Sequence, residues 1–248
     1  MTVQIHDTGG IRRVTLMRDR KLNTLNSAVL LDLAEAFTVD EDARAVVLAG
    51  EGERAFIGGA DITEMAQISS PDQARSFIKR IHAVCAAIRA CPVPVIARVQ
   101  GFCLGAGLEI AAACDLRLAG EQARFGMPEV RVGLPSVVEA ALLPGLIGWG
   151  RTRRLLLLGE TIAAQEALEW GLVERVVPNA SLESALEEWL HMLLEAGPHA
   201  IRAQKALIAE WEELTPARGI DAGIGSFGRA FETDEPARML GAFVNRKR

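Results

Sequence analysis

The chain lacks the features that mark membrane-spanning, secreted and general nucleic-acid-binding proteins. No run approaches the ~18 consecutive apolar residues of a membrane span, and the opening MTVQIHDTGG has no cationic segment followed by an apolar one. Acidic residues outnumber basic ones, 32 to 27, which argues against a general nucleic-acid surface. The terminal Arg246-Lys247-Arg248 is a local cluster of cations and is interpreted as a solvated tail. We therefore expect a soluble, cytoplasmic protein that binds neither a membrane nor a nucleic acid.

Metal, disulfide and dinucleotide motifs are also missing. The four histidines lack the spacing of metal ligands, so no metal site is expected. Residues 223–228 match G-x-G-x-x-G, but no convincing strand precedes them and too few residues follow for a dinucleotide-binding βαβ unit. The cysteines form no C-x-x-C pair and lie in apolar surroundings, typical of buried thiols in a reducing compartment: Cys85, Cys91, Cys103 and Cys114.

Length and composition predict one α/β domain with a helical appendage. The chain has 248 residues, 50% of them hydrophobic, which suffices for a sizeable core. The expected strands are 3–6 and 11–17, paired as a hairpin, then 45–49, 94–97, 116–119, 123–125 and 172–177. The expected helices are 27 to about 42, 71–89, one after residue 105, 136–143, 150–158, 163–170, 182–194, 199–212 and 236–243. Residues 61–70 are polar and expected to be mobile. The order indicates repeated β-β-α units followed by a helical C-terminal third.

Residues 96–129, IARVQGFCLGAGLEIAAACDLRLAGEQARFGMPE, carry the strongest chemical signal. A β-branched run leads into Gly105-Ala106-Gly107 and then an Ala-rich helix with one carboxylate, Glu109. Small residues at a strand-to-helix turn let a ligand approach the backbone, and the free N–H groups of the first helical turn face that ligand. A second carboxylate, Glu129, follows another short strand. These features together favour an enzyme that stabilises an oxyanion and moves a proton.

At these residues the chain resembles the enoyl-CoA hydratase/isomerase (crotonase) superfamily over almost its full length. Three segments carry the resemblance: AFIGGADI at 55–62, GFCLGAGLEIAAACD at 101–115 and FGMPE at 125–129. Supporting matches are LNTLN at 22–26, GETIAAQEA at 159–167 running into GLV at 171–173, and AFV at 242–244. The resemblance implies a spiral of β-β-α units at 1–190 and a helical extension at 191–248 that mediates trimerisation and covers the CoA site.

The resemblance also implies a substrate and an assembly. The substrate is an acyl-CoA thioester, so CoA enters with the substrate and no separate cofactor is expected. The assembly is a homotrimer or a pair of trimers. The implied CoA-binding residues are Arg20, Lys21 and Leu22 on one loop, Ala60, Asp61 and Ile62 on a second, Ala106, and Phe227 and Arg246 near the C-terminus. Asp61 is interpreted as a turn or helix-capping residue rather than a catalytic one.

The catalytic roles that the resemblance implies agree with the chemistry of hydration. The backbone N–H groups of Ala60 and Ala106 would form an oxyanion hole, and Glu109 and Glu129 would hold the water. Addition of water to an α,β-unsaturated thioester places charge on the thioester oxygen, and two carboxyl groups of different protonation serve it best. The apolar residues nearby favour a protonated Glu129, with Glu109 polarising the water.

The segment after Glu129 departs from the small-residue run that is typical of the family. Glu139 could be a third carboxylate facing the acyl pocket, with Ser136 and Val137 beside it. The alternative is a capping box, in which Ser136 caps a helix and Glu139 reaches back to it. We favour the capping box, and both interpretations remain open at this point.

The leading hypothesis is hydration of a trans-2-enoyl-CoA to a 3-hydroxyacyl-CoA. A double-bond isomerase with the same oxyanion hole is the alternative, since isomerases of this superfamily can work with one glutamate. A non-catalytic CoA-ester or RNA-binding homologue is the third hypothesis, and the acidic composition and the two glutamates disfavour it.

Overall fold

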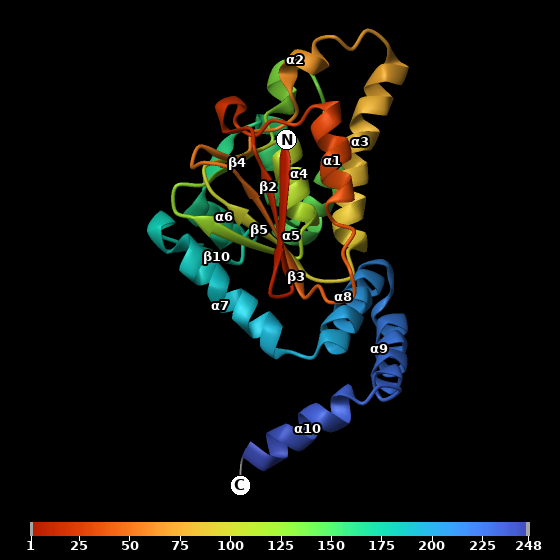
Figure 1. The fold of residues 1–248 in the computed structure, drawn as a ribbon. Coiled ribbons are helices and arrows are strands. Elements are labelled where there is room, and N and C mark those ends of the chain that lie inside the picture. The colour runs from red at the N-terminus through yellow and green to blue at the C-terminus, as the bar shows by residue number, and fades with distance from the viewer. Residues whose placement is uncertain (1, 247–248) are drawn as a thin grey trace.

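Two β-sheets form the centre of the fold in this computed structural model, which describes residues 2–246 (Figure 1). The larger sheet has the strand order β1-β2-β3-β5-β7-β10, and the smaller has the order β4-β6-β8-β9. Neighbouring strands are parallel except β1 with β2 and β8 with β9. The strands are β1 (Val3–Thr8), β2 (Ile11–Leu16), β3 (Ala45–Gly50), β4 (Ala55–Ile57), β5 (Val95–Val99), β6 (Phe102–Leu104), β7 (Leu116–Gly120), β8 (Arg124–Gly126), β9 (Thr161–Ala163) and β10 (Arg175–Val177).

Successive strand pairs divide between the two sheets, which confirms the predicted spiral of β-β-α units. In the pairs β3–β4, β5–β6 and β7–β8, the first strand joins the larger sheet and the second joins the smaller. The helices are α1 (Ser27–Glu35), α2 (Ile62–Met65), α3 (Pro71–Ala90), α4 (Ala106–Ala113), α5 (Leu143–Leu158), α6 (Ala164–Trp170), α7 (Leu182–Glu195), α8 (Pro198–Glu213), α9 (Pro216–Ala230) and α10 (Glu235–Arg246). Short 3-10 helices are η1 (Asp19–Lys21), η2 (Glu129–Val132), η3 (Val138–Leu142) and η4 (Asn179–Ser181).

The larger sheet is covered on both faces, which suits its mostly parallel strands. Successive side chains of a strand point to opposite faces. In β3, Val46 and Leu48 enter the main core, whereas Ala45 and Val47 belong to a second cluster that includes the leucines of α7. Helix α7 therefore covers the outer face, and the main core lies on the other face, toward the smaller sheet.

A buried lysine, Lys205, ties α8 to the core. Lys205 Nζ lies 2.7 Å from Asp115 Oδ2 and donates to the carbonyl oxygens of Ile88 and Val93 at 3.2 and 3.0 Å. Helices α9 and α10 lie away from the core beyond α8, and α10 is remote from both sheets (Figure 1). The division of the chain at residues 190 and 191 stays a prediction.

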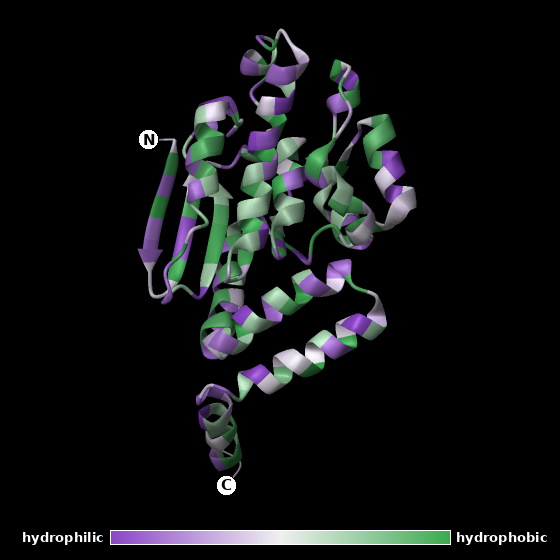
Figure 2. Cartoon of the chain, turned by 90° about the vertical axis from the view of Figure 1, so that its right-hand side faces the viewer, coloured by the Kyte–Doolittle hydropathy of each residue, from purple (hydrophilic) through white to green (hydrophobic). Residues whose placement is uncertain are grey.

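Exposed apolar side chains lie along the last two helices. On α9 they are spaced three or four residues apart, so they share one face of the helix: Ile220, Ile224, Phe227 and Phe231. Figure 2 shows hydrophobic and hydrophilic residues alternating along these helices. Across residues 2–246, no helix combines the length and the apolar character needed to cross a membrane.

Most predicted elements are confirmed, including the N-terminal hairpin and α3. The short strands β4 and β6 were not predicted, and α5 begins at Leu143 rather than at residue 150. Four further elements differ. Helix α1 begins after its Asn26 cap as predicted and ends at Glu35 rather than near residue 42, before the β-branched Thr38 and Val39. The polar segment 61–70 contains α2, and β9 was not predicted.

Helix α9 is the fourth difference. The region contains four glycines, which lower helix propensity by about 1 kcal/mol each relative to Ala. Gly219 is nevertheless required where α9 crosses α8: an added Cβ would lie 3.0 Å from the Trp211 ring, and Trp211 Nε1 donates to Gly219 O at 2.9 Å. Tertiary packing therefore outweighs the local propensity.

Candidate active site

Three adjacent parallel strands of the smaller sheet place the predicted catalytic segments together. Strand β6 lies between β4 and β8 and runs parallel to both. The turn with Ala60 follows β4, α4 with Ala106 and Glu109 follows β6, and Glu129 follows β8. The carboxyl ends of parallel strands meet at one edge of a sheet, where α/β proteins commonly bind ligands. The structure therefore brings these four residues to a single edge.

The backbone N–H of Ala60 is left without a partner. Leu25 N donates to Gly59 O at 2.9 Å, and Asp61 N donates to Leu25 O at 2.8 Å, so this short parallel bridge uses the neighbours of Ala60 on both sides. Gly59 has φ +109°, which an L side chain rarely adopts, and this conformation turns the chain at the end of β4. No hydrogen bond within residues 2–246 uses the Ala60 N–H.

Ala106 offers a second free N–H at the start of α4. The first N–H groups of a helix have no intrahelical partner, and the N-cap Gly105 has no side chain to satisfy them. Gly107 lies against β4, where an added Cβ would collide with Ile57 O, so only glycine lets α4 approach this strand. The close approach sets the Ala106 N–H beside the turn that follows β4.

Glu109 is the most deeply buried of the two predicted catalytic acids, with 4% of its surface exposed. Its pKa is raised to about 8, first by burial and then by the negative charges of Glu129 and Glu139. Hydrogen bonds from the backbone N–H groups of Ala140 and Val137 act in the opposite direction. Glu109 is therefore the acid that holds a proton at neutral pH, whereas the sequence favoured Glu129.

Glu129 is half-buried and lies over the start of α4. An added Cβ at Gly105 would collide with Glu129 Oε1, and Ser136 Oγ donates to Glu129 Oε2 at 2.8 Å. One carboxylate oxygen is thus at the N-terminus of α4, and the other is held by Ser136. The arrangement positions Glu129 beside the free N–H of Ala106.

The predicted capping box is wrong. Helix η3 begins at Val138, its N-cap Val137 receives no side-chain hydrogen bond, and Ser136 binds Glu129 instead. Val138 has φ +39°, so the backbone is not helical where the box required a first turn. Glu139 reaches across to α3, where its Oε1 lies 2.7 Å from His82 Nδ1. Its place in an acyl pocket stays a prediction.

Comparison with known proteins identifies the family. The family model described as enoyl-CoA hydratase/isomerase matches residues 6–248. The chain belongs to the enoyl-CoA hydratase/isomerase family. It is 32% identical over 250 residues to a short-chain-enoyl-CoA hydratase of Clostridium acetobutylicum, covering 99% of this chain and 95% of the relative. It is 34% identical over 235 residues to a crotonyl-CoA hydratase of Syntrophomonas wolfei, covering 93% and 90%.

A solved structure has the same fold. The enoyl-CoA hydratase of Mycobacterium smegmatis superposes with a TM-score of 0.96 at 30% identity, over 99% of this chain and 97% of that one. The resemblance stated from the sequence motifs is thereby confirmed, as is the fold class. This chain is an enzyme of the family, with curated relatives that are hydratases.

The loop expected to lie along CoA is tied to the oxyanion turn. Arg20 and Lys21 are exposed in η1, and Leu22, with φ +53°, accepts a hydrogen bond from Gly58 N at 2.8 Å. This hydrogen bond joins the two loops. Ile62, at the start of α2, is largely exposed nearby.

Asp61 caps α2, as the sequence indicated. Its Oδ1 accepts a hydrogen bond from Thr63 N at 3.1 Å, and its Oδ2 lies 3.2 Å from Arg18 Nη2. Burial raises the pKa of Asp61, but the Arg18 and Thr63 hydrogen bonds and the charge of Lys21 outweigh it, and the net pKa is lowered. This carboxylate is committed to internal partners.

The C-terminal candidates are not brought to the site within one chain. Phe227 lies on α9, 71% exposed, and its ring contacts Phe231 with centroids 5.4 Å apart. Arg246 ends α10, and its side chain lies outside the described residues, as do Lys247 and Arg248. Any role of these residues at a CoA site stays a prediction.

Sequence reasoning missed the α3 residues that face the acids. His82 pairs with Glu139, and Cys85 lies next to both Glu109 and Glu139. The available signal was their spacing: His82 and Cys85 are three residues apart and therefore share one side of α3. In residues 2–246 no group of three or more His, Cys, Asp or Glu side chains is arranged to hold a metal ion.

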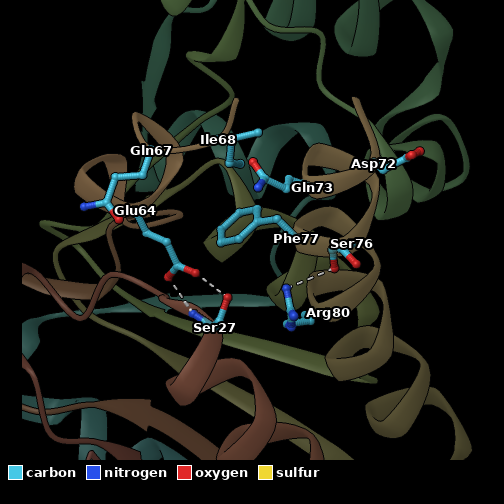
Figure 3. A pocket seen from close by; sticks show the side chains of 9 residues that line it. All are labelled: Ser27, Glu64, Gln67, Ile68, Asp72, Gln73, Ser76, Phe77 and Arg80. Atoms are coloured by element: carbon cyan, nitrogen blue, oxygen red, sulfur yellow. Dashed lines mark hydrogen bonds between the residues drawn. The ribbon is translucent and has the colours of Figure 1, made fainter. Parts of the chain in front are cut away.

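A separate hollow of about 530 Å³ lies between the start of α1, α2 and α3 (Figure 3). Glu64 crosses it and accepts hydrogen bonds from Ser27 N, at 2.7 Å, and from Ser27 Oγ. These contacts join α2 to α1. The lining residues do not include the paired glutamates, so this hollow is distinct from the candidate site.

Replacing Gly105 with Ala tests the packing at the start of α4. We expect the free energy of unfolding to fall by about 1–3 kcal/mol, because alanine is strained at φ +52° and its Cβ collides with Glu129. Urea denaturation measures the change. Gly145→Ala is the control: it lies in α5 with open space around the added Cβ, and we expect no loss of stability there. Equal losses of stability in Gly105→Ala and Gly145→Ala would contradict the close contact between Gly105 and Glu129.

Replacing Glu109 with Gln tests the burial of this acid. Folding requires Glu109 to keep a proton that the unfolded chain releases above its ordinary pKa, so wild-type stability falls as pH rises towards 8. We expect Glu109→Gln to gain about 1.4 kcal/mol relative to wild type per pH unit between pH 5 and 8, and no more above pH 8. Thermal or urea unfolding across this range measures it. The exposed Glu121→Gln should follow wild type, and a flat difference for Glu109→Gln would refute the assignment.

Proposed function

We propose that this enzyme adds water to a trans-2-enoyl-CoA and releases a 3-hydroxyacyl-CoA. The observation that carries the proposal is the pair of unpartnered N–H groups, of Ala60 and Ala106, at one sheet edge with Glu109 and Glu129 beside them. The hydratase relatives support the same reaction. CoA enters as part of the substrate, and the reaction needs no further cofactor.

The two N–H groups stabilise the charge that the reaction creates. Attack of water on Cβ moves an electron pair through Cα to the thioester oxygen, which becomes enolate-like. Two preorganised donors that converge on this oxygen lower the barrier, and losing one such donor typically costs about 10²–10³ in rate. Because Ala60 and Ala106 donate from the backbone, among the ordinary substitutions only proline, which has no N–H, removes either donor directly.

The two glutamates supply the proton movements. Water must lose one proton and Cα must gain one, so the site needs one ionised and one protonated carboxyl group. Glu109 carries the proton in the ligand-free site, since burial raises its pKa to about 8. The charge of Glu129 contributes to that rise, so the two acids behave as a coupled pair.

The loops around the oxyanion turn are the proposed CoA-binding surface. Arg20 and Lys21 are exposed cations on the loop that Gly58 fixes, and cations there suit the phosphates of CoA. Leu22, Asp61 and Ile62 complete this surface, with Asp61 acting by holding Arg18 and α2 in place.

Hydration is tested by turnover of short, medium, long and aromatic enoyl-CoA esters, with loss of enoyl absorbance as signal and products resolved by mass. We expect Glu109→Gln and Glu129→Gln each to lose about 10²–10⁴ in kcat, because each removes one proton-transfer group. Glu121→Gln is the exposed control and should keep wild-type activity. An isomerase that relies on Glu129 alone would survive Glu109→Gln, and absence of turnover with every ester would refute the hydratase assignment.

We also propose that the enzyme assembles as a homotrimer or a pair of trimers through its C-terminal helices. The apolar face of α9 is exposed in the single chain, and covering it requires a partner surface. Assembly would also give Phe227 and Arg246 access to a CoA site that one chain does not complete.

Analytical ultracentrifugation measures the assembly. The full chain should sediment with three or six times the 26.7 kDa of one chain. Ile224→Lys should shift the equilibrium towards single chains, because it places a charge on the apolar face, whereas Arg218→Glu, at an exposed charged position of α9, should not. A wild-type protein that stays a single chain at micromolar concentration would contradict the proposed assembly.

A further inference from the structure

Glu139 is a buried acid that the proposed reaction does not use. It lies in η3 with 7% of its surface exposed. Its Oε1 is 2.7 Å from His82 Nδ1, and because a carboxylate only accepts hydrogen bonds, Nδ1 is the donor. Its Oε2 is fully buried and has no hydrogen-bond partner within the described part of the chain. A buried oxygen without a donor is costly, so its retention needs an explanation.

The same segment that carries Glu139 also holds Glu109. Helix η3 packs against α4 and α3. The backbone N–H groups of Val137 and Ala140, on either side of Glu139, lie close enough to Glu109 to lower its pKa. The Cys85 thiol on α3 faces both acids. Glu139 therefore lies beside Glu109.

The backbone is strained at the residue that precedes Glu139. Val138 has φ +39°, a conformation that β-branched residues almost never adopt. Such strain persists only where the surroundings enforce it, and it is concentrated at functional sites. Here it directs Glu139 inward to His82 instead of continuing a regular helix that would cap itself.

We propose that Glu139 is a positioning residue for the catalytic pair: its carboxylate, held by His82, keeps the neighbouring Glu109 in the protonated form. This inference rests on the proposed function for its catalytic meaning and on the side-chain geometry for its physical basis. His82 is 59% exposed, so it connects the buried acid to solvent.

The groups around Glu109 make Glu139 the relevant charge. Two acids face Glu109: Glu129, which lies in η2, and Glu139, which lies in η3. Cys85 of α3 also faces Glu109. Burial raises the pKa of this thiol well above its usual range, so the thiol is neutral. His82 contacts Glu139 rather than Glu109. Two negative neighbours in a low-dielectric environment disfavour a third negative charge, and Glu129 is itself required for chemistry. Glu139 is thus the neighbour that can be changed without removing a reacting group.

A direct titration tests the proposal without any substrate. In protein labelled with ¹³C at the glutamate carboxyl carbons, the Glu109 resonance is the one lost in Glu109→Gln. Its midpoint in wild type should lie near pH 8. Glu139→Gln keeps an acceptor for His82 while removing the charge, so we expect the midpoint to fall by at least about one pH unit. Asp72→Asn, an exposed acid on α3, is the matched control and should leave it unchanged. An unchanged midpoint in Glu139→Gln would overturn the proposal.

A second variant, at His82, tests the part that this histidine plays. His82→Ala removes the donor to Glu139 Oε1, so the carboxylate of Glu139 loses its stabilising partner and the Glu109 midpoint should fall in the same direction. This change lies at a half-exposed position and leaves all three acids in place. If Glu139→Gln lowers the midpoint and His82→Ala does not, the part assigned to His82 is wrong.

The pH profile of kcat/KM links the titration to catalysis. If turnover needs the Glu109 proton, wild-type activity declines above about pH 8, and this alkaline limb moves to lower pH in Glu139→Gln. A one-unit shift corresponds to about a tenfold lower ratio of activity at pH 9 to activity at pH 6. A shifted resonance with no hydration of any ester would refute the proposed function and leave the Glu139 assignment intact. Hydration of an ester together with an unshifted Glu109 resonance would refute the Glu139 assignment and leave the proposed function intact.

Discussion

The close contact between α4 and strand β4 is the constraint on which the site depends. Gly107 lies where any side chain would collide with Ile57 O, so the first turn of α4 can approach the sheet edge only through glycine. This approach sets the N–H of Ala106 next to the turn that carries Ala60. It also buries the whole of α4, Glu109 included. The free N–H of Ala106 at this edge and the burial that raises the pKa of Glu109 are thus two results of one packing arrangement.

Electrostatics at this edge are dominated by negative charge in a dry environment. Glu109 is buried with Glu129 on one side and Glu139 on the other, so a proton remains bound near neutral pH. The cost of this arrangement is distributed over the surrounding structure: Ser136 holds Glu129, His82 holds Glu139, and backbone N–H groups of η3 hold Glu109. A site of this kind lowers the free energy of unfolding and keeps a proton available for transfer. Such a loss of stability is common where catalysis requires acids with shifted pKa values.

Sequence motifs were sufficient to predict the elements that bear the chemistry. The AFIGGADI and GFCLGAGLEIAAACD segments contain glycines at the turns and one carboxylate in an apolar helix, and each of these local features has a local physical cause. The segment around Glu139 was predicted less well. Its S-x-x-E spacing has two physical interpretations, and the choice between them depended on Val138 and on His82, which is far away in sequence. The glycine-rich α9 was missed for a similar reason, since its contact with Trp211 of α8 outweighs its weak propensity.

The sequence alone determined the family, the β-β-α order of the core and the two loops and two glutamates of the candidate site. These depend on turn chemistry, periodicity and short motifs, all of which act within a few residues. The tertiary structure alone decided which glutamate carries the proton and where Glu139 points. It also decided that Phe227 stays away from the site within one chain. Protonation depends on burial and on the charges that distant segments bring near, and neither quantity is contained in local sequence.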